Sequence, residues 1–221
     1  MEIENLLPFD ILYKLINKAG TVEFSGLLNK GNVSPIYNMN PEETVAISFS
    51  VIGTDLKSDV AIINAAGNDS VDEQIVCRDK TGAKLELLIA YEQVGEFGHA
   101  SRVSFYSPYV ILNKTDLSLL FCVNTFMGSK QPSAGQSDIL AHALEGRPYV
   151  SKPILFSYPE FEVISNRACF KLADSPATEW SDPVSFEAVG SGSERSLMSQ
   201  KLATQFLFSI NIDQGVGKVL L

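Results

Sequence analysis

The sequence predicts an all-β fold of two tandem β-sandwich repeats, and three observations support this prediction. Apolar and polar residues alternate over many short stretches, turn-forming residues separate these stretches, and parts of the first half resemble parts of the second. Alternation places one face of a strand in the core, and many short strands with regular turns are typical of sandwiches and barrels. A chain of 221 residues with 45% hydrophobic residues is long enough for one or two domains with a sizeable core.

The alternation defines strands along both halves of the chain. It is clearest at three places: Val45–Val51, Leu85–Tyr91 and Phe206–Ile212. Turn-forming residues occur at three other places: Asn29–Asn32, Lys80–Gly82 and Gly190–Ser193. Asp138–Glu145 is the one segment with a helical pattern, which Ser137 can cap and Gly146 can end. We therefore expect little helix.

An aromatic-rich strand over residues 104–112 is the most informative segment, because it runs directly into Asn113. Asn and Asp side chains hydrogen-bond nearby backbone groups and end strands. A similar arrangement occurs near the start, where a short apolar strand ends at Asn5 and another begins at Ile11. These matching segments predict one repeat over residues 1–103 and a second over residues 104–221.

Two further matches link the repeats. Phe49–Gly53 resembles Phe186–Gly190, and Ile89–Gly95 resembles Ser209–Gly215. In the first repeat, Ile89–Gly95 leads into the strand that ends at Asn113. The second repeat stops at the corresponding point, so we expect a further strand, and more chain, to follow Leu221.

The composition argues against two classes of partner. The net charge of −9 disfavours nucleic acid and electrostatic docking on anionic lipid.

Cys77, Cys122 and Cys169 are widely spaced in apolar runs, which predicts buried free thiols in a reducing compartment. The sequence shows no signal peptide, and the uncharged run Leu117–Ser129 is too short to cross a bilayer. We therefore expect a cytoplasmic protein.

Catalytic chemistry has little support in the sequence. His99 and His142 lie far apart and in different repeats, without the convergent partners that a metal site or catalytic triad needs. Gly95–Gly98 is followed by no helix pattern and no Lys-Ser/Thr pair, so it is not a phosphate-binding loop. We expect no enzyme activity, no cofactor and no metal.

A resemblance to a known family rests on ordered blocks of residues. These blocks are Tyr106–Thr115, Lys152–Pro159, Asn166–Ala168 and Trp180–Gly190. Together they resemble the adaptor-binding region of the vacuolar-protein-sorting-thirteen family, the chorein-type, bridge-like lipid-transport proteins of membrane contact sites. The resemblance covers essentially the whole chain. It implies β-sandwich repeats that are each marked by an asparagine, here Asn5 and Asn113, and the blocks resemble repeats five and six.

The resemblance also implies a function. Members of the family use this region to bind short Pro-x-Pro motifs on organelle-specific membrane adaptor proteins, which places them at contact sites. This chain contains no Pro-x-Pro motif, as suits a protein that reads one. Two alternatives remain, a structural spacer within a β-repeat scaffold and a carbohydrate- or lipid-binding sandwich. The absence of a signal peptide weakens the last.

The residues expected to bind peptide or to support its site are Asn113, Tyr109, Lys114, Thr115, Asn5, Phe156 and Tyr158. For Asn113 two roles are open, a bond to its own loop and a bond to a bound peptide. The aromatic residues can pack inside the sandwich or line a groove for prolines. We expect Trp180 in the core, because Trp buries a large area. A peptide could bind by strand addition or in an aromatic groove.

Overall fold

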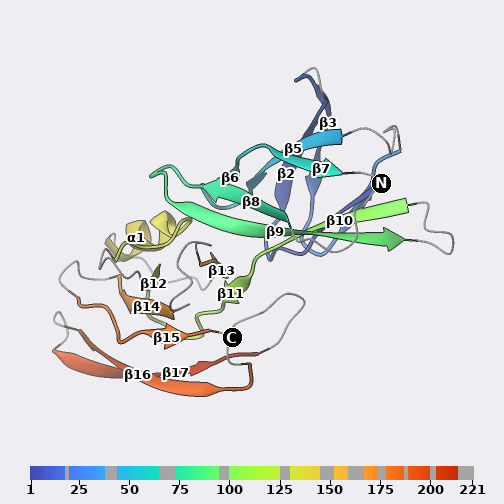
Figure 1. Cartoon of the computed structure of the whole chain (residues 1–221). Helices are drawn as coiled ribbons and strands as arrows, with labels where there is room; N and C mark the ends of the chain where they lie inside the picture. The colour runs from blue at the N-terminus through green and yellow to red at the C-terminus, as the bar shows by residue number, and fades with distance from the viewer. Residues whose placement is uncertain are drawn as a thin grey trace. The chain divides into compact units, whose positions relative to one another are not determined.

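The computed structural model forms two compact units, Met1–Ser107 and Pro108–Leu221 (Figure 1). The structure describes residues 1–17, 20–37, 44–64, 73–94, 100–124, 130–144, 152–158, 167–173, 178–186, 189–199 and 203–213. His99 and the predicted end of the helix at Glu145–Gly146 lie outside these residues.

The first unit is one sheet of ten strands. Its strands are β1 (Glu2–Asn5), β2 (Ile11–Ile16), β3 (Val22–Leu28), β4 (Val33–Pro35), β5 (Thr44–Val51), β6 (Lys57–Ser58), β7 (Ala61–Asn64), β8 (Glu73–Arg78), β9 (Lys84–Val94) and β10 (Ala100–Tyr106). The order is β3-β2-β5-β6-β8-β9-β10-β1-β4, and β7 pairs with β5. The pair β1–β10 is parallel, and the other pairs are antiparallel.

This sheet curls until its two end strands come close. β3 and β4 stand at opposite ends of the strand order but follow each other in the chain through the turn Asn29–Asn32. The turn contains Gly31 at φ 72°, a backbone conformation that glycine adopts without steric cost. The backbone of Asn5 on β1 bonds both Gly31 and Asn32, at 2.7 and 3.0 Å. The alternating apolar residues of β2, β5 and β9 fill the enclosed core.

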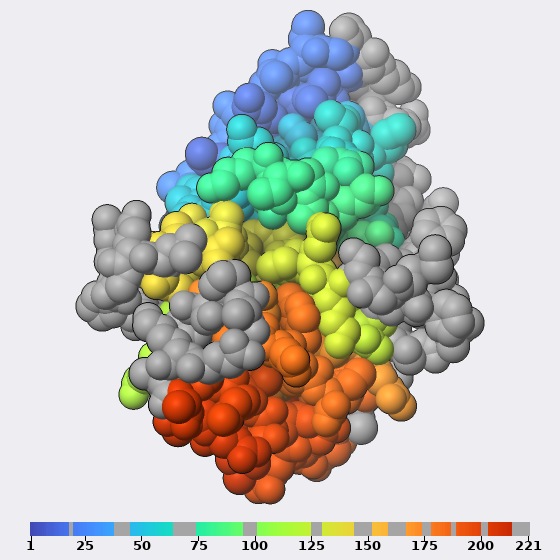
Figure 2. All heavy atoms as spheres, turned by 90° about the vertical axis from the view of Figure 1, so that its left-hand side faces the viewer, coloured from blue at the N-terminus to red at the C-terminus, as the bar shows by residue number. Residues whose placement is uncertain are grey.

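The second unit has three small sheets and one helix among its described residues. Its elements are β11 (Tyr109–Ile111), β12 (Leu119–Val123), α1 (Ser137–Leu144), β13 (Ile154–Phe156), β14 (Arg167–Leu172), β15 (Val184–Ser185), β16 (Gly192–Ser199) and β17 (Thr204–Asn211). The sheets are β11-β13, β12-β14-β15 and the hairpin β16-β17. Their inward faces share one apolar core that includes Phe121, Phe156, Phe170 and Phe208. Figure 2 shows the hairpin as the red surface at the bottom of the view.

The all-β prediction is confirmed, and α1 is the one helix in the described part of the chain. The strand predicted over residues 104–112 is interrupted: β10 ends at Tyr106 and β11 begins at Tyr109. Pro108 between them has no N–H to donate to a ladder. β10 pairs within the first unit, so the units divide at Ser107/Pro108 rather than at 103/104.

The sequence match between β9 and β17 also shifts by one residue in the structure. Ile89 on β9 is buried and faces the core, whereas Ser209, its expected counterpart, is exposed. The inward-facing residue of β17 at this point is Ile210, which packs against the core of the second unit. A shift of one residue moves a side chain to the opposite face, so Ile210 is the structural counterpart of Ile89.

Candidate functional site

Asn5 ends β1 in the first unit with its side chain fully buried. Its Nδ2 donates to the carbonyl oxygens of Phe9 at 2.8 Å and Leu28 at 3.1 Å. Its Oδ1 accepts a bond from the N–H of Leu7 at 3.1 Å. One side chain therefore closes its own loop and ties it to the end of β3.

Asn113 does the same after β11 in the second unit. Its Nδ2 donates to the carbonyl oxygen of Leu117 at 2.7 Å, and its Oδ1 accepts a bond from the N–H of Thr115 at 3.0 Å. The Thr115 hydroxyl adds a second bond to Oδ1 at 2.7 Å, and the N–H of Leu117 donates to that hydroxyl at 3.2 Å. Asn113 thus bonds its own loop, which is the first of the two roles considered for it.

The predicted aromatic residues form a cluster inside the second unit. Tyr109 and Phe156 are buried, and Tyr158 is half-buried. The ring of Tyr158 lies edge-on to both, with centroids 5.2 Å apart in each case. Phe186 joins them at 5.5 Å from Phe156. Buried rings in mutual contact stabilise the core, and Tyr109 and Phe156 pack inside the unit in this way.

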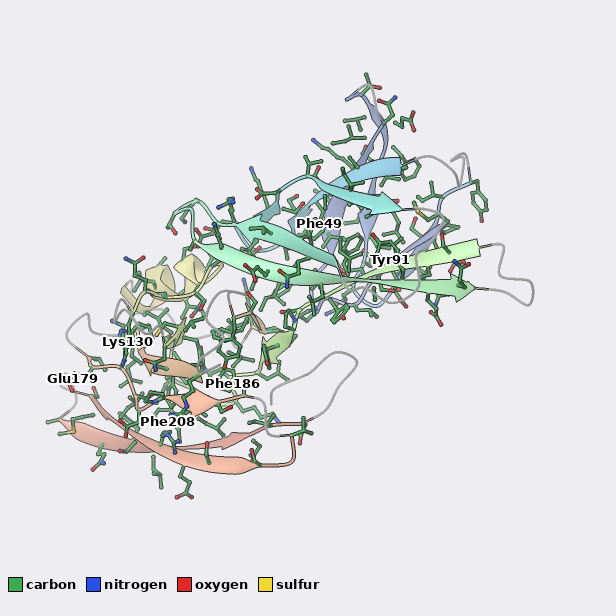
Figure 3. All side chains as sticks on the ribbon, in the orientation of Figure 1. Phe49, Tyr91, Lys130, Glu179, Phe186 and Phe208 are labelled. Carbon is green, nitrogen blue, oxygen red and sulfur yellow. The ribbon has the colours of Figure 1, made fainter. Side chains whose placement is uncertain are left out.

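A recess of about 380 Å³ opens beside the Asn113 loop. Residues Ile111–Thr115 line one part of it, and Phe208–Asp213 at the end of β17 line another. The turn Gly190–Gly192 and the side chains of Leu119, Phe121, Phe170 and Phe186 complete the lining. Figure 3 shows Phe186 and Phe208 inside the second unit. The recess thus joins a polar loop, which includes the exposed Lys114, to an aromatic floor.

The sequence predicts only some of the residues that line the recess. Asn113, Lys114 and Thr115 are expected site residues that border the recess. Phe208 and Phe186 are not among those expected, although Phe186 lies in a segment that repeats between the two halves and Phe208 directly precedes another. Asn5 belongs to the other unit. Trp180, expected in the core, is half-buried, and the Nζ atom of Lys171 lies 5.2 Å from the centroid of its ring.

The three cysteines are buried and free. Cys122 and Cys169, distant in sequence, are direct cross-strand neighbours on β12 and β14. A hydrogen bond with Cys122 and the charge of Lys130 lower the pKa of Cys169 to about 7, while the same thiol contact and burial raise the pKa of Cys122. Burial, with a smaller effect of Asp59, raises the pKa of Cys77 to about 12.

Within the described residues no three His, Cys, Asp or Glu side chains cluster as metal ligands would. His142 on α1 is 2.7 Å from the carbonyl oxygen of Asp138 in its own helix. No described helix is long and apolar enough to cross a membrane.

Comparison with known proteins relates the sequence of this chain to one protein family. The family model described as "Vacuolar-sorting associated protein 13, adaptor binding domain" matches residues 1–221. Intermembrane lipid transfer protein VPS13 of Chaetomium thermophilum is 32% identical over 221 residues, which are 99% of this chain and 7% of that protein. Intermembrane lipid transfer protein VPS13A of Mus musculus is 27% identical over 213 residues, which are 95% of this chain and 6% of that protein. The chain therefore corresponds to a small part of these relatives.

Proposed function

The chain belongs to the adaptor-binding domain family of vacuolar-sorting associated protein 13, and from this we propose that it binds short Pro-x-Pro motifs on organelle-specific membrane adaptor proteins. The family match over the whole chain carries the proposal. Both relatives carry names that describe intermembrane lipid transfer, and we propose that a domain of this kind directs such a protein to a membrane contact site. We propose the same peripheral placement, through adaptors, for the protein that contains this chain.

We propose strand addition as the mode of binding, because the second unit offers a suitable edge. In the described part of this unit β16 pairs with β17 on one side and with no strand on the other. A Pro-x-Pro segment is pre-extended, since proline fixes φ near −65° and restricts the preceding residue. Its two prolines lack N–H groups on the same side of the strand, so it can pair along one side only. An outer edge meets that requirement.

The side chains of β16 agree with this use. Its exposed residues alternate with inward-facing ones, and Met198 near its end is 57% exposed. A thioether side chain adapts to irregular apolar partners, so Met198 provides a contact for a proline ring. In this arrangement Asn113 supports the site by holding a loop that lines the same recess as Gly190 and Ser191, which directly precede β16.

Capture on immobilised peptide tests the proposal. The intact chain is passed over a synthetic peptide with a central Pro-x-Pro motif and over the same peptide with both prolines replaced by alanine. We expect retention on the first and not on the second. Equal retention on both peptides, or none on either, would instead favour the structural-spacer alternative.

A further inference from the structure

Six residues of the first unit form one row across the outer face of its sheet. Each residue is the direct cross-strand partner of the next, on β3, β2, β5, β6, β8 and β9 in turn. The members are Leu27, Leu12, Ser50, Lys57, Arg78 and Lys84. All are exposed or half-buried, and each has a buried core residue directly beside it in the chain. Since side chains alternate between the two faces of a strand, the row faces away from the core.

One end of the row is apolar. The side chains of Leu12 and Leu27, which are partners across β2 and β3, are 51% and 56% exposed. Ile52, directly after β5, is also exposed, and its N–H donates to the carbonyl oxygen of Asp10 at 2.8 Å, which continues the pairing of β5 with β2. These three side chains give a partner an apolar area to cover, and covering such an area is favourable.

The other end of the row is basic. Lys57, Arg78 and Lys84 are consecutive members, so three cations lie side by side on neighbouring strands. Arg78 pairs with Asp59 at 3.1 Å, whereas no carboxylate of the described residues pairs with Lys57 or Lys84. Like charges that are directly opposite each other destabilise a sheet. An anionic group over the row would relieve this repulsion.

Lys14 adds a fourth cation to this face. It is exposed on β2, opposite Ser25 on β3 and Ser48 on β5. Glu86, the next outward residue of β9, is opposite Val76 rather than a member of the row. Three of the four cations, all of them lysines, thus lack an acidic partner within the described ranges.

A groove of about 650 Å³ follows the row from Leu27 to Lys57. Its lining joins the exposed leucines to Lys14 and Lys57 through the hydroxyl groups of Ser25, Ser48 and Ser50. The strands beneath, β2 and β5, are paired on both sides, so their backbone groups are already used by the sheet. A ligand on this face is therefore held by side chains and not by strand addition.

We infer that this outer face binds a short, extended peptide segment of a partner protein, with apolar residues at one end and acidic residues at the other. The inference goes beyond the proposed binding of Pro-x-Pro motifs, and neither depends on the other. Neighbouring strands lie about 4.8 Å apart, so the row spans about 24 Å. An extended segment advances about 3.3 Å per residue. Apolar residues at positions 1 and 3 and acidic residues at positions 5, 7 and 9 therefore match the row.

The net charge of −9 favours a short peptide over a polyanionic surface. A membrane or a nucleic acid presents its charge over an area larger than the row and therefore meets the repulsion of the acidic protein as a whole. A short segment interacts chiefly with charges within about one Debye length, about 8 Å at physiological salt. Within that range the basic end of the row supplies the attraction.

Fluorescence anisotropy with a labelled nine-residue peptide tests the inference. The peptide has leucine at positions 1 and 3, glutamate at positions 5, 7 and 9, and serine between them. Lys57→Gln combined with Lys84→Gln should weaken its binding about three- to tenfold at about 50 mM salt, as expected for two exposed ion pairs. Lys30→Gln combined with Lys152→Gln is the control, because it makes the same change of charge at exposed lysines outside the row. Equal affinity of the two variants would overturn the inference.

The unchanged protein supplies a second arm that does not depend on how the variants fold. Replacing the three glutamates of the peptide by glutamine should abolish binding, and raising salt from about 50 to about 300 mM should weaken it, because ion pairs are screened. Equal binding of the glutamine peptide would overturn the inference. A Pro-x-Pro peptide should bind equally well to the Lys57/Lys84 variant and to its control, so the failure of one proposal is distinguishable from the failure of the other.

The apolar end has its own matched pair of variants. Leu12→Ser should weaken binding of the nine-residue peptide, whereas Leu207→Ser, which changes an exposed leucine of the second unit, should not. An equal effect of the two substitutions would contradict the placement of the peptide on the row.

Sedimentation with vesicles tests the alternative that this face meets a membrane. Vesicles of phosphatidylcholine with about one-third phosphatidylserine should not retain the protein. Retention that is lost in the Lys57/Lys84 variant and kept in its control would assign the face to anionic lipid and would overturn the inference.

Discussion

Asn5 and Asn113 make the same pair of hydrogen bonds in the two units. Each accepts a bond at Oδ1 from the N–H two residues later, and each donates from Nδ2 to the carbonyl oxygen four residues later. The residues between differ, Leu-Leu-Pro in one loop and Lys-Thr-Asp in the other. The asparagine side chain, rather than the sequence of the loop, therefore sets the loop geometry.

Replacing either asparagine should destabilise its own unit. Asn113→Ala leaves the N–H of Thr115 and the carbonyl of Leu117 without their side-chain partner, and an orphaned buried polar group costs about 1–3 kcal/mol. We expect the free energy of unfolding to fall by about that amount. Trp180, the single tryptophan, lies in the second unit and reports this loss by fluorescence during urea denaturation.

Lys114→Ala is the matched control for this prediction. Lys114 is the exposed neighbour of Asn113, and surface substitutions usually change stability by less than about 0.5 kcal/mol. Asn5→Ala, followed by circular dichroism, should cost at least as much as Asn113→Ala, since Asn5 is fully buried and also bonds Leu28. An Asn113→Ala protein as stable as the Lys114→Ala protein would contradict this account.

Local patterns made much of the fold predictable. Alternation identifies β5, β9 and β17, and an asparagine at the end of a strand identifies both closed loops, because these features depend on residues near one another in sequence. The recess could not be predicted in this way, since its walls come from β11 and β17, which pair with different strands. The contact of Cys122 with Cys169 could not be predicted for the same reason. The pairing of β12 with β14, which are distant in sequence, brings the two residues together.

Alkaline pH should destabilise the protein through Cys77. The pKa of this thiol is raised from 9.0 to about 12 in the folded state, first by burial and then by Asp59. The unfolded chain therefore loses the proton first, and the stabilising contribution present below pH 9 is lost as pH rises towards 12. Cys77→Ala should lower Tm at all pH values, but its further loss of Tm between near-neutral and alkaline pH should be smaller than in the unchanged protein. The same pH-dependent loss in both proteins would show that Cys77 is not responsible.

All three thiols should be reduced in freshly purified protein, and a mild oxidant should join one pair only. Opposed residues of antiparallel strands have Cα atoms about 4.5–5.5 Å apart, within the range of a disulfide. Cys122 and Cys169 meet this condition through their register, and Cys77 belongs to the other unit. Mass spectrometry after alkylation should find three free thiols at first and a Cys122–Cys169 link after diamide. A disulfide before oxidation, or one that involves Cys77, would contradict the prediction.

Met198 should contribute to adaptor binding, and Leu207 should not. Both side chains are well exposed on the hairpin, at 57% and 69%, but Met198 belongs to the open strand β16 and Leu207 to β17. We expect Met198→Ser to weaken Pro-x-Pro binding about three- to tenfold, which corresponds to about 1 kcal/mol of apolar contact. Leu207→Ser is the control, and fluorescence anisotropy measures both. An equal effect of the two substitutions would exclude β16 as the peptide edge.

The central claim is that this chain recognises Pro-x-Pro segments, and calorimetric titration of the intact chain with such a peptide tests it most directly. We predict a micromolar Kd, about −8 kcal/mol, that changes little between about 50 and about 300 mM salt, because apolar burial and backbone hydrogen bonds are not screened as ion pairs are. The same peptide with both prolines replaced by alanine should bind far more weakly. Equal affinity for the two peptides, with the chain folded by circular dichroism, would contradict the claim.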